Sequence, residues 1–185
     1  FALHAIPWGP AIAALFVGAL FLMAHVRPEQ FMQDDSYFYL QIAHNIAAGF
    51  GSTFNRITPT NGYHPLWELM CAPLAWVARG DKRTLLHLVL GVQQILFLAT
   101  WLLLGRVVAG PSAPSRRWLL LPVLAYGFLF LRTYASEAFL FAFVLAGTLL
   151  VLQRDWGAFD VWRSFRFGLL AGLAFLSRLD SIFLI

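Results

Sequence analysis

The chain has 185 residues, of which 60% are hydrophobic, 16% aromatic and 12% charged, and its formal net charge is +4. Soluble domains carry about 25% charged residues, so this composition excludes an ordinary soluble domain, a disordered chain and a coiled coil. The basic excess does not indicate nucleic-acid binding, because in membrane proteins the placement of basic residues in loops matters more than their sum.

The first apolar segment, Ala5–Val26, contains no Asp, Glu, Lys or Arg. About 20 such residues cross the hydrocarbon core of a bilayer. No basic residue precedes the apolar stretch and no small-residue cleavage site ends it, so we predict a retained membrane helix and not a signal peptide. Because the sequence starts at Phe1 and stops inside an apolar run, we expect a fragment of a longer protein.

Further apolar segments predict an all-α membrane protein with about five transmembrane helices in a single domain over residues 1–185. The later segments are Thr84–Gly105, Trp118–Leu131, Ala138–Gln153 and a run that begins at Phe167 and resumes at Ser181–Ile185. The second and third of these are short, and they can span only if flanking arginines extend their stems to the interface.

The segment Leu66–Ala78 is apolar but brief, and it holds Glu68. We predict an interfacial or re-entrant helix here, so that residues 27–84 form one extracytoplasmic loop. The basic segments 105–117 and 154–166 then face the cytoplasm, as the positive-inside rule favours. If Leu66–Ala78 crossed instead, segment 105–117 would face outwards.

The outer loop starts with a predicted amphipathic helix beside the membrane. Asp34 and Asp35 stand where this helix begins, apolar residues follow at four-residue spacing, and Gly49 and Gly51 supply the stop. The second half, Ser52–Pro65, is rich in Thr, Asn, Gly and Pro and is predicted to be a structured loop. Loops held on a rigid scaffold often carry binding groups.

The acidic pair Asp34 and Asp35 has two explanations. One carboxylate can cap the backbone amides while the other favours the helix macrodipole. Alternatively, one acts as a base or a metal ligand at the membrane surface, where a lipid-borne substrate would arrive. Spacing alone leaves both explanations open.

Charged residues at membrane depth are costly, and they are paired or functional. Glu137 and Asp180 are the carboxylates of this kind, and Arg132 is a structural partner for Glu137. Arg178 can bind a phosphate through its guanidinium fork. Arg178 and Asp180 would not face each other within one helix, since they are two residues apart.

Polar residues of the outer loop are further candidates. His64 can donate to a phosphate or an acceptor hydroxyl, and Asn55 and Asn61 are candidate sugar or phosphate contacts, although Asn61-Gly62 is first of all a turn. The lone Cys71 predicts packing and no disulfide. No Walker loop, Rossmann glycine pattern, HExxH site or nucleophile elbow is present in the sequence, which argues against a soluble nucleotide-sugar domain.

The stretch DDSYFYLQIAHNIAAGFGSTFN, followed by TPTNGYHPLW, resembles the first extracytoplasmic loop of the GT-C class of integral membrane glycosyltransferases. More narrowly, it is similar to bacterial polyprenyl-phosphate-sugar-dependent members related to arabinofuranosyl- and mannosyltransferases. The matching positions are Asp34, Asp35, Ala43, Asn45, Gly49, Gly51, Thr60, Pro65, Leu66 and Trp67. The resemblance extends to RTYASEAFLF and GLLAGLAFLSRLDS, although Ala-Ser-Glu-Ala here replaces a setting like Gly-Met-Glu-Thr around Glu137.

The resemblance implies an inverting transfer of a sugar from a polyprenyl-phosphate donor to a lipid, glycan or protein hydroxyl at the outer face of a bacterial inner membrane. Asp35 would be the general base, and Asp34 would orient it or hold a divalent cation. The family is mixed in its use of metal, so Mg²⁺ or Mn²⁺ is an optional cofactor. The residues expected to bind substrate are His64, Asn61, Asn55, Arg178, Glu137 and Asp180.

Two other functions stay open. The chain could be a non-catalytic polytopic subunit that packs with a partner in a larger membrane complex and keeps a degenerate transferase loop for its shape. A transporter is the third option, but the acidic pair lies in a loop, whereas transporter sites tend to lie at the bilayer midplane on broken helices.

Overall fold

A computed structural model of the chain describes residues 8–109, 120–121, 123–125, 127, 134–155, 157 and 160–180. Most of the predicted span Trp118–Leu131 lies outside these residues, as do Arg132 and the last apolar run from Ser181. The described residues form helices and isolated bridges but no strand. The all-α prediction is confirmed for this part of the chain.

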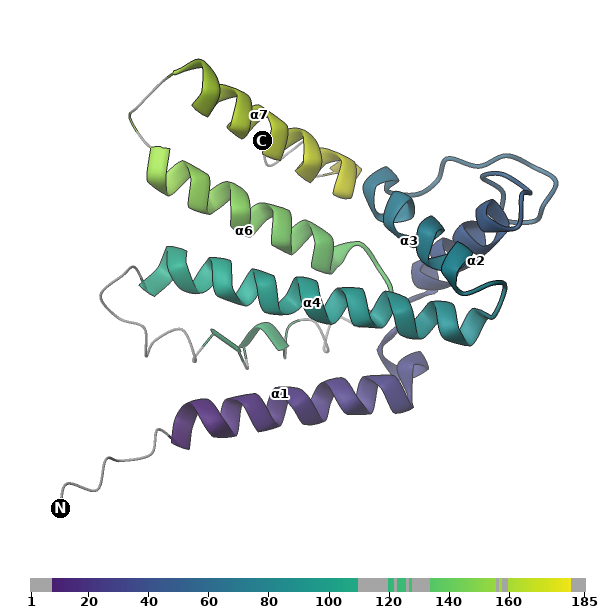
Figure 1. Cartoon of the computed structure of the whole chain (residues 1–185), viewed down its shortest axis with the longest axis horizontal. Coiled ribbons are helices and arrows are strands. Elements are labelled where there is room, and N and C mark those ends of the chain that lie inside the picture. Colours follow the sequence, from purple (N-terminus) through teal and green to yellow (C-terminus); the bar gives the residue numbers. More distant parts are fainter. Residues whose placement is uncertain are drawn as a thin grey trace.

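Four long helices lie side by side, and two shorter helices pack across one end of them, as Figure 1 shows. The long helices are α1 (Trp8–Val26), α4 (Lys82–Ala109), α6 (Ala138–Asp155) and α7 (Val161–Ser177). The two shorter helices are α2 (Asp34–Ala47) and α3 (Pro65–Val77), and a short 3₁₀ turn, η1 (Pro28–Phe31), leads into α2. We call the end of the row that they cover the capped end. In the row, α4 packs against α1 and α6, and α6 packs against α7.

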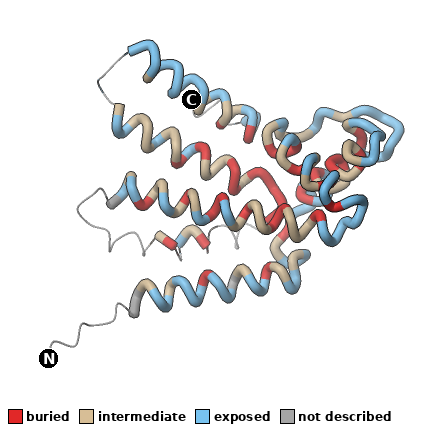
Figure 2. The backbone as a smooth tube through the Cα atoms, in the orientation of Figure 1, coloured by how far each residue is buried: buried red, intermediate tan, exposed pale blue. Residues whose placement is uncertain are grey.

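Two of the long helices are long and apolar enough to cross a membrane, over Lys82–Val108 and Ala138–Asp155. They contain the predicted spans Thr84–Gly105 and Ala138–Gln153. Many residues of the long helices are exposed (Figure 2), including large apolar ones such as Ile95 on α4 at 68%. A lipid environment explains such exposure, because soluble monomers rarely expose large apolar patches. Whether α1 and α7 also cross stays a prediction.

Helix α2 agrees with the predicted amphipathic helix. Asp34 and Asp35 occupy its first turn, but the N-cap residue is Gln33 and no side-chain bond caps this end. Capping of the backbone amides by the acidic pair is therefore wrong. Of the first explanation, only a favourable interaction with the helix macrodipole is left. The chain leaves the helix through Gly49, whose φ of +84° is a conformation that glycine adopts readily.

Helix α3 corresponds to the predicted interfacial or re-entrant segment. It has 13 residues, begins with Pro65 in its first turn, and packs against α2, α4 and α7 without joining the row of long helices (Figure 1). Its only charged residue, Glu68, is 3% exposed. Within the described residues neither carboxyl oxygen of Glu68 has a hydrogen-bond partner, and burial raises the pKa of this side chain to about 8.

The ends of α4 and α6 and the start of α7 lie at the opposite end of the row (Figure 1). Gln153 Nε2 donates to Val107 O at 3.3 Å, which joins α6 to α4 there. Asp155 accepts from Arg166 at 3.0 Å and lies 3.9 Å from Arg163 Nε. The described parts of segments 105–117 and 154–166 thus share one end of the row, while the prediction that this end faces the cytoplasm stays a prediction.

Most of the buried residues lie at the capped end (Figure 2). Trp67, Phe97 and Phe139 are each at most 1% exposed, and Phe21 of α1 meets Phe97 of α4 edge to face at a centroid distance of 5.0 Å. Among the described residues the buried core is therefore concentrated at the capped end, which makes this end a rigid support for the residues described next.

Candidate functional site

The turn before α6 is fixed by hydrogen bonds from three other elements. Tyr134 N–H donates to Phe31 O at 3.1 Å, and Ser36 Oγ donates to Tyr134 O at 2.6 Å. From α4, Gln93 accepts from Ala135 N at 2.7 Å and donates to Ser136 O at 2.8 Å.

Ala135 holds a φ of +57°, which costs an L-residue roughly 1–2 kcal/mol. Strain of this kind persists only where the surroundings impose it, and it is common at functional sites. The hydrogen bonds around the turn impose it here, and together they determine where Glu137, two residues after Ala135, is placed.

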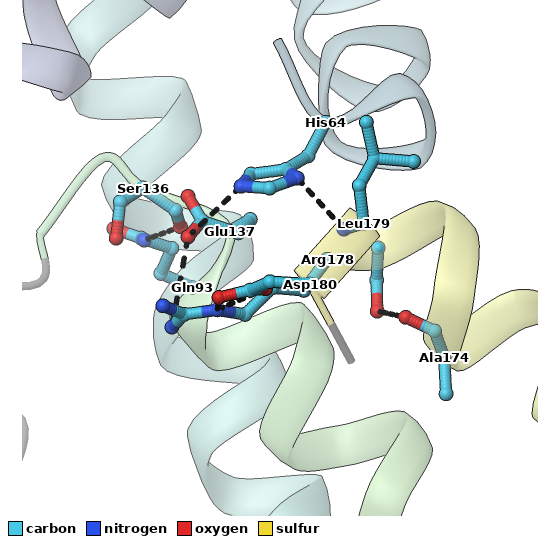
Figure 3. Close-up of polar contacts among 9 residues, drawn as sticks. His64, Gln93, Ser136, Glu137, Ala174, Arg178, Leu179 and Asp180 are labelled. Carbon is cyan, nitrogen blue, oxygen red and sulfur yellow. Dashed lines mark hydrogen bonds and ion pairs between the residues drawn. The ribbon is translucent and has the colours of Figure 1, made fainter. Parts of the chain in front are cut away.

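Glu137 lies at the centre of the polar cluster in Figure 3. It is 8% exposed, and its Oε1 lies 3.7 Å from His64 Nε2 and 3.9 Å from an Arg178 guanidinium nitrogen. Three predicted site residues from distant parts of the sequence are therefore neighbours. The partner predicted for Glu137, Arg132, lies outside the described residues.

His64 links the outer loop to the end of α7. Its Nδ1 accepts a hydrogen bond of 3.0 Å from the backbone N–H of Leu179 (Figure 3). An accepting Nδ1 carries no proton, so the neutral ring carries its proton on Nε2, the atom that faces Glu137. His64 is thus arranged to donate towards the carboxylate.

Arg178 and Asp180 form an ion pair, which corrects the expectation that they would not face each other. Helix α7 ends at Ser177, so the two residues lie beyond it, and Arg178 Nε reaches the two carboxylate oxygens of Asp180 at 2.8 and 3.2 Å. The hydrogen bond from Arg178 lowers the pKa of Asp180, and the same bond raises the pKa of Arg178. The guanidinium therefore has two carboxylate neighbours, Asp180 and Glu137.

A cleft of about 380 Å³ opens between the start of α2 and residues 61–64, which end the loop between α2 and α3. It is lined by Asp35, Phe38, Tyr39, Asn61, Gly62, Tyr63, His64 and Leu179. Three predicted site residues, Asp35, Asn61 and His64, thus share one cleft. A larger hollow of about 670 Å³ lies between the ends of α2 and α3 and contains none of the predicted site residues.

Tyr39 connects this cleft to the buried cluster. Burial raises the pKa of its hydroxyl well above the ordinary value, and the carboxylates of Glu137 and Asp35 raise it further. Its ring is stacked beside that of His64 at a centroid distance of 6.4 Å. Tyr39 therefore stays neutral and can donate a hydrogen bond. Composition and spacing did not single it out, because its significance depends on the distant Glu137.

Two predicted residues have other surroundings. Asn55 Oδ1 accepts from the backbone N–H groups of Ile57 and Thr58 at 3.0 and 2.8 Å, so its acceptor is used in a turn of the loop. Asn55 does not line the cleft. Asp34 is exposed and does not line the cleft either.

The loop owes its shape to Asn45, which is fully buried on α2. Its Nδ2 donates to Thr53 O and Phe54 O at 2.8 and 3.0 Å, and its Oδ1 accepts from Gln41 at 3.0 Å and Arg56 at 3.1 Å. Asn45 was one of the positions matching the family pattern, but no role was predicted for it. Its role here is to hold the loop against α2.

A metal centre has little support from these residues. Within the described part of the chain no three His, Cys, Asp or Glu side chains converge as ligands of one ion. The proposed ligand Asp34 is thus not part of a group of three such donors there, and metal use stays an expectation from the resemblance.

Comparisons with known proteins found no family model, no curated protein and no solved structure that matches the chain.

Proposed function

We propose that the chain is a multi-pass bacterial inner-membrane glycosyltransferase of the GT-C class with about five transmembrane helices, and that the capped end carries its active site on the outer side. The substrates would be a polyprenyl-phosphate sugar and an acceptor hydroxyl on a lipid, glycan or protein. One observation carries the proposal: residues selected from separate segments of the sequence meet at one place. Asp35, Asn61 and His64 line the cleft, and Glu137 and Arg178 lie directly behind His64.

Asp35 is the proposed general base. It is exposed within the cleft and can accept a proton. The acceptor oxygen would attack the anomeric carbon and lose its proton to Asp35, while the bond from that carbon to the phosphate oxygen breaks and its electron pair leaves with the lipid phosphate. Attack opposite to the leaving group inverts the anomeric centre.

Arg178 is the proposed partner of the leaving phosphate. A guanidinium fork suits a phosphate that gains negative charge, and Arg178 is about 42% exposed at its side chain. Because Asp180 already binds Arg178 Nε, a phosphate would compete with Asp180 for this group. Asp180 and Glu137 then act as positioning residues and not as direct substrate ligands.

The decisive experiment is transfer from a radiolabelled polyprenyl-phosphate sugar in proteoliposomes that contain the full chain. We expect Asp35→Asn to reduce turnover by at least a hundredfold, with normal membrane insertion. Glu29→Gln is a matched control, since it also neutralises an exposed carboxylate in the outer loop but lies outside the cleft. Equal turnover in Asp35→Asn and wild type would refute the base assignment.

A non-catalytic role has one observation in its favour. The charges of Arg178, Asp180 and Glu137 already neighbour one another, as expected of a cluster kept for shape. A subunit of this kind would show no transfer in the same proteoliposomes with any donor of the class, and it would co-purify with a partner in fixed stoichiometry.

A further inference from the structure

The chemistry of the cleft bears on a question that the proposed function leaves open, namely which class of acceptor is used. The polar groups that line the cleft include the Asp35 carboxylate and the Asn61 amide. The His64 ring also lines it, but its two nitrogens are directed at the Leu179 N–H and at Glu137. None of the described residues that line it is lysine or arginine, and the nearby Arg178 is paired with Asp180. These groups suit an uncharged ligand with many hydroxyls better than a phosphate.

Apart from Leu179, the large apolar side chains of the cleft are aromatic. Phe38, Tyr39 and Tyr63 line it, so aromatic rings and hydrogen-bonding groups share one cleft. A sugar ring presents hydroxyls at its edge and C–H groups on its faces, and it is recognised by this combination. The volume of about 380 Å³ lies within the range of about 300–1,000 Å³ typical of small-ligand sites.

The aromatic surface continues outside the cleft. Phe38 stacks on Phe54 with ring centroids 4.6 Å apart and ring planes 30° apart. The two side chains are 48% and 44% exposed, so each leaves part of its ring open. Asn45 fixes the backbone at Phe54 through a hydrogen bond of 3.0 Å, which makes this pair a preorganised platform.

We propose that the cleft, together with the stacked pair Phe38 and Phe54, is a saccharide-binding site, and that its ligand is the acceptor of the transfer. The acceptor role rests on the proposed function, whereas the saccharide-binding site does not. The acceptor hydroxyl would lie beside Asp35, and the following sugar units would lie along the aromatic pair. A lipid alcohol or a serine hydroxyl of a peptide would leave that platform unused.

Binding is tested without catalysis on an array of neutral oligosaccharides, using the full chain in detergent, with saturation-transfer NMR for the oligosaccharides that bind. We expect at least one neutral oligosaccharide to bind, and Phe38→Ala combined with Phe54→Ala to weaken binding at least tenfold. Phe38→Tyr keeps a ring face and should retain binding within about threefold. Ile57→Ala is the matched control, because Ile57 is an apolar loop residue, 83% exposed, that does not line the cleft.

Transfer assays with three acceptors separate this inference from the proposed function. Transfer to a bound oligosaccharide supports both. Transfer to a lipid alcohol or a peptide hydroxyl, without oligosaccharide binding, overturns the saccharide site and leaves the transferase standing. Oligosaccharide binding without transfer from any polyprenyl-phosphate sugar overturns the transferase and the acceptor role but leaves the binding site. Binding that is equal in wild type and in the double alanine variant overturns the site itself.

Discussion

The Nδ1 atom of His64 accepts a hydrogen bond from the backbone N–H of Leu179, which is 115 residues further along the chain. This contact joins the outer loop to the end of α7 and turns the other ring nitrogen of His64 towards Glu137 at 3.7 Å. The His64 side chain therefore holds two cleft-lining segments together and also forms part of the surroundings of the buried Glu137 carboxylate.

Removing the His64 ring nitrogens should impair the site more than the fold. We expect His64→Phe to lower transfer at least tenfold and to speed hydrogen exchange at the Leu179 amide, because the acceptor of that N–H is lost. His64→Asn places an amide oxygen near the position of Nδ1 and should restore protection. Mass-spectrometric hydrogen exchange of peptides covering 178–180 measures this, and equal protection in wild type and His64→Phe would contradict the role of the bond.

Gln93 should contribute to stability far more than its neighbour Gln94. Gln93→Leu leaves the buried Ala135 N–H and Ser136 C=O without their partner, and each such loss costs about 1–3 kcal/mol. Gln94 has a buried Nε2 without a partner among the described residues, so Gln94→Leu should be neutral or stabilising. Thermal unfolding in detergent compares the two variants. A loss of stability as large in Gln94→Leu as in Gln93→Leu would show that Gln93 has no special role.

Glu68 should make the capped end less stable as pH rises. Its folded pKa of about 8 lies above the ordinary value of 4.5, so the folded state favours the protonated acid. Between about pH 4.5 and pH 8 the unfolded state ionises first, and stability falls over this window by on the order of 4 kcal/mol. Glu68→Gln carries no proton to lose, so its stability should exceed that of the wild type increasingly towards pH 8. Parallel pH profiles of the two proteins would rule out a buried neutral Glu68.

The two ends of the helix row should lie on opposite sides of the membrane. Asn61→Cys is at the capped end and Trp162→Cys is at the other, and both positions are exposed. In intact cells an impermeant maleimide should label the first, and it should label the second only after permeabilisation. The native Cys71 is fully buried and gives the background. Labelling of both positions from outside would contradict the topology.

Elements with a local signal could be predicted from the sequence. Helix α2 follows from an acidic start, apolar spacing and terminal glycines, and α4 and α6 follow from long runs without charge. Helix α3 could be distinguished from the spans because it is short and holds Glu68 and Pro73. In each case the physical cause lies within a few residues of the element.

The contacts of the site could be predicted only in part. Asp35, Asn61 and His64 were identified from the loop, but Tyr39 and Gln93 were not, since each acts through a residue about 40 to 100 positions away. The pair Arg178 and Asp180 was misjudged because helix α7 was expected to continue through it, whereas it ends at Ser177. Helix ends without a strong local stop signal are poorly determined by sequence alone.

The His64–Leu179 contact also bears on biogenesis. A growing chain is extended at about 5–20 residues per second, so roughly 6–23 s separate synthesis of His64 from synthesis of the residue that completes its surroundings. During this interval the loop between α2 and α3 is complete, but the end of α7 does not yet exist. The cleft is therefore completed late. In a chain stalled before residue 179, the hydrogen bonds from Asn45 can already hold the loop, but His64 still lacks its contact with Leu179.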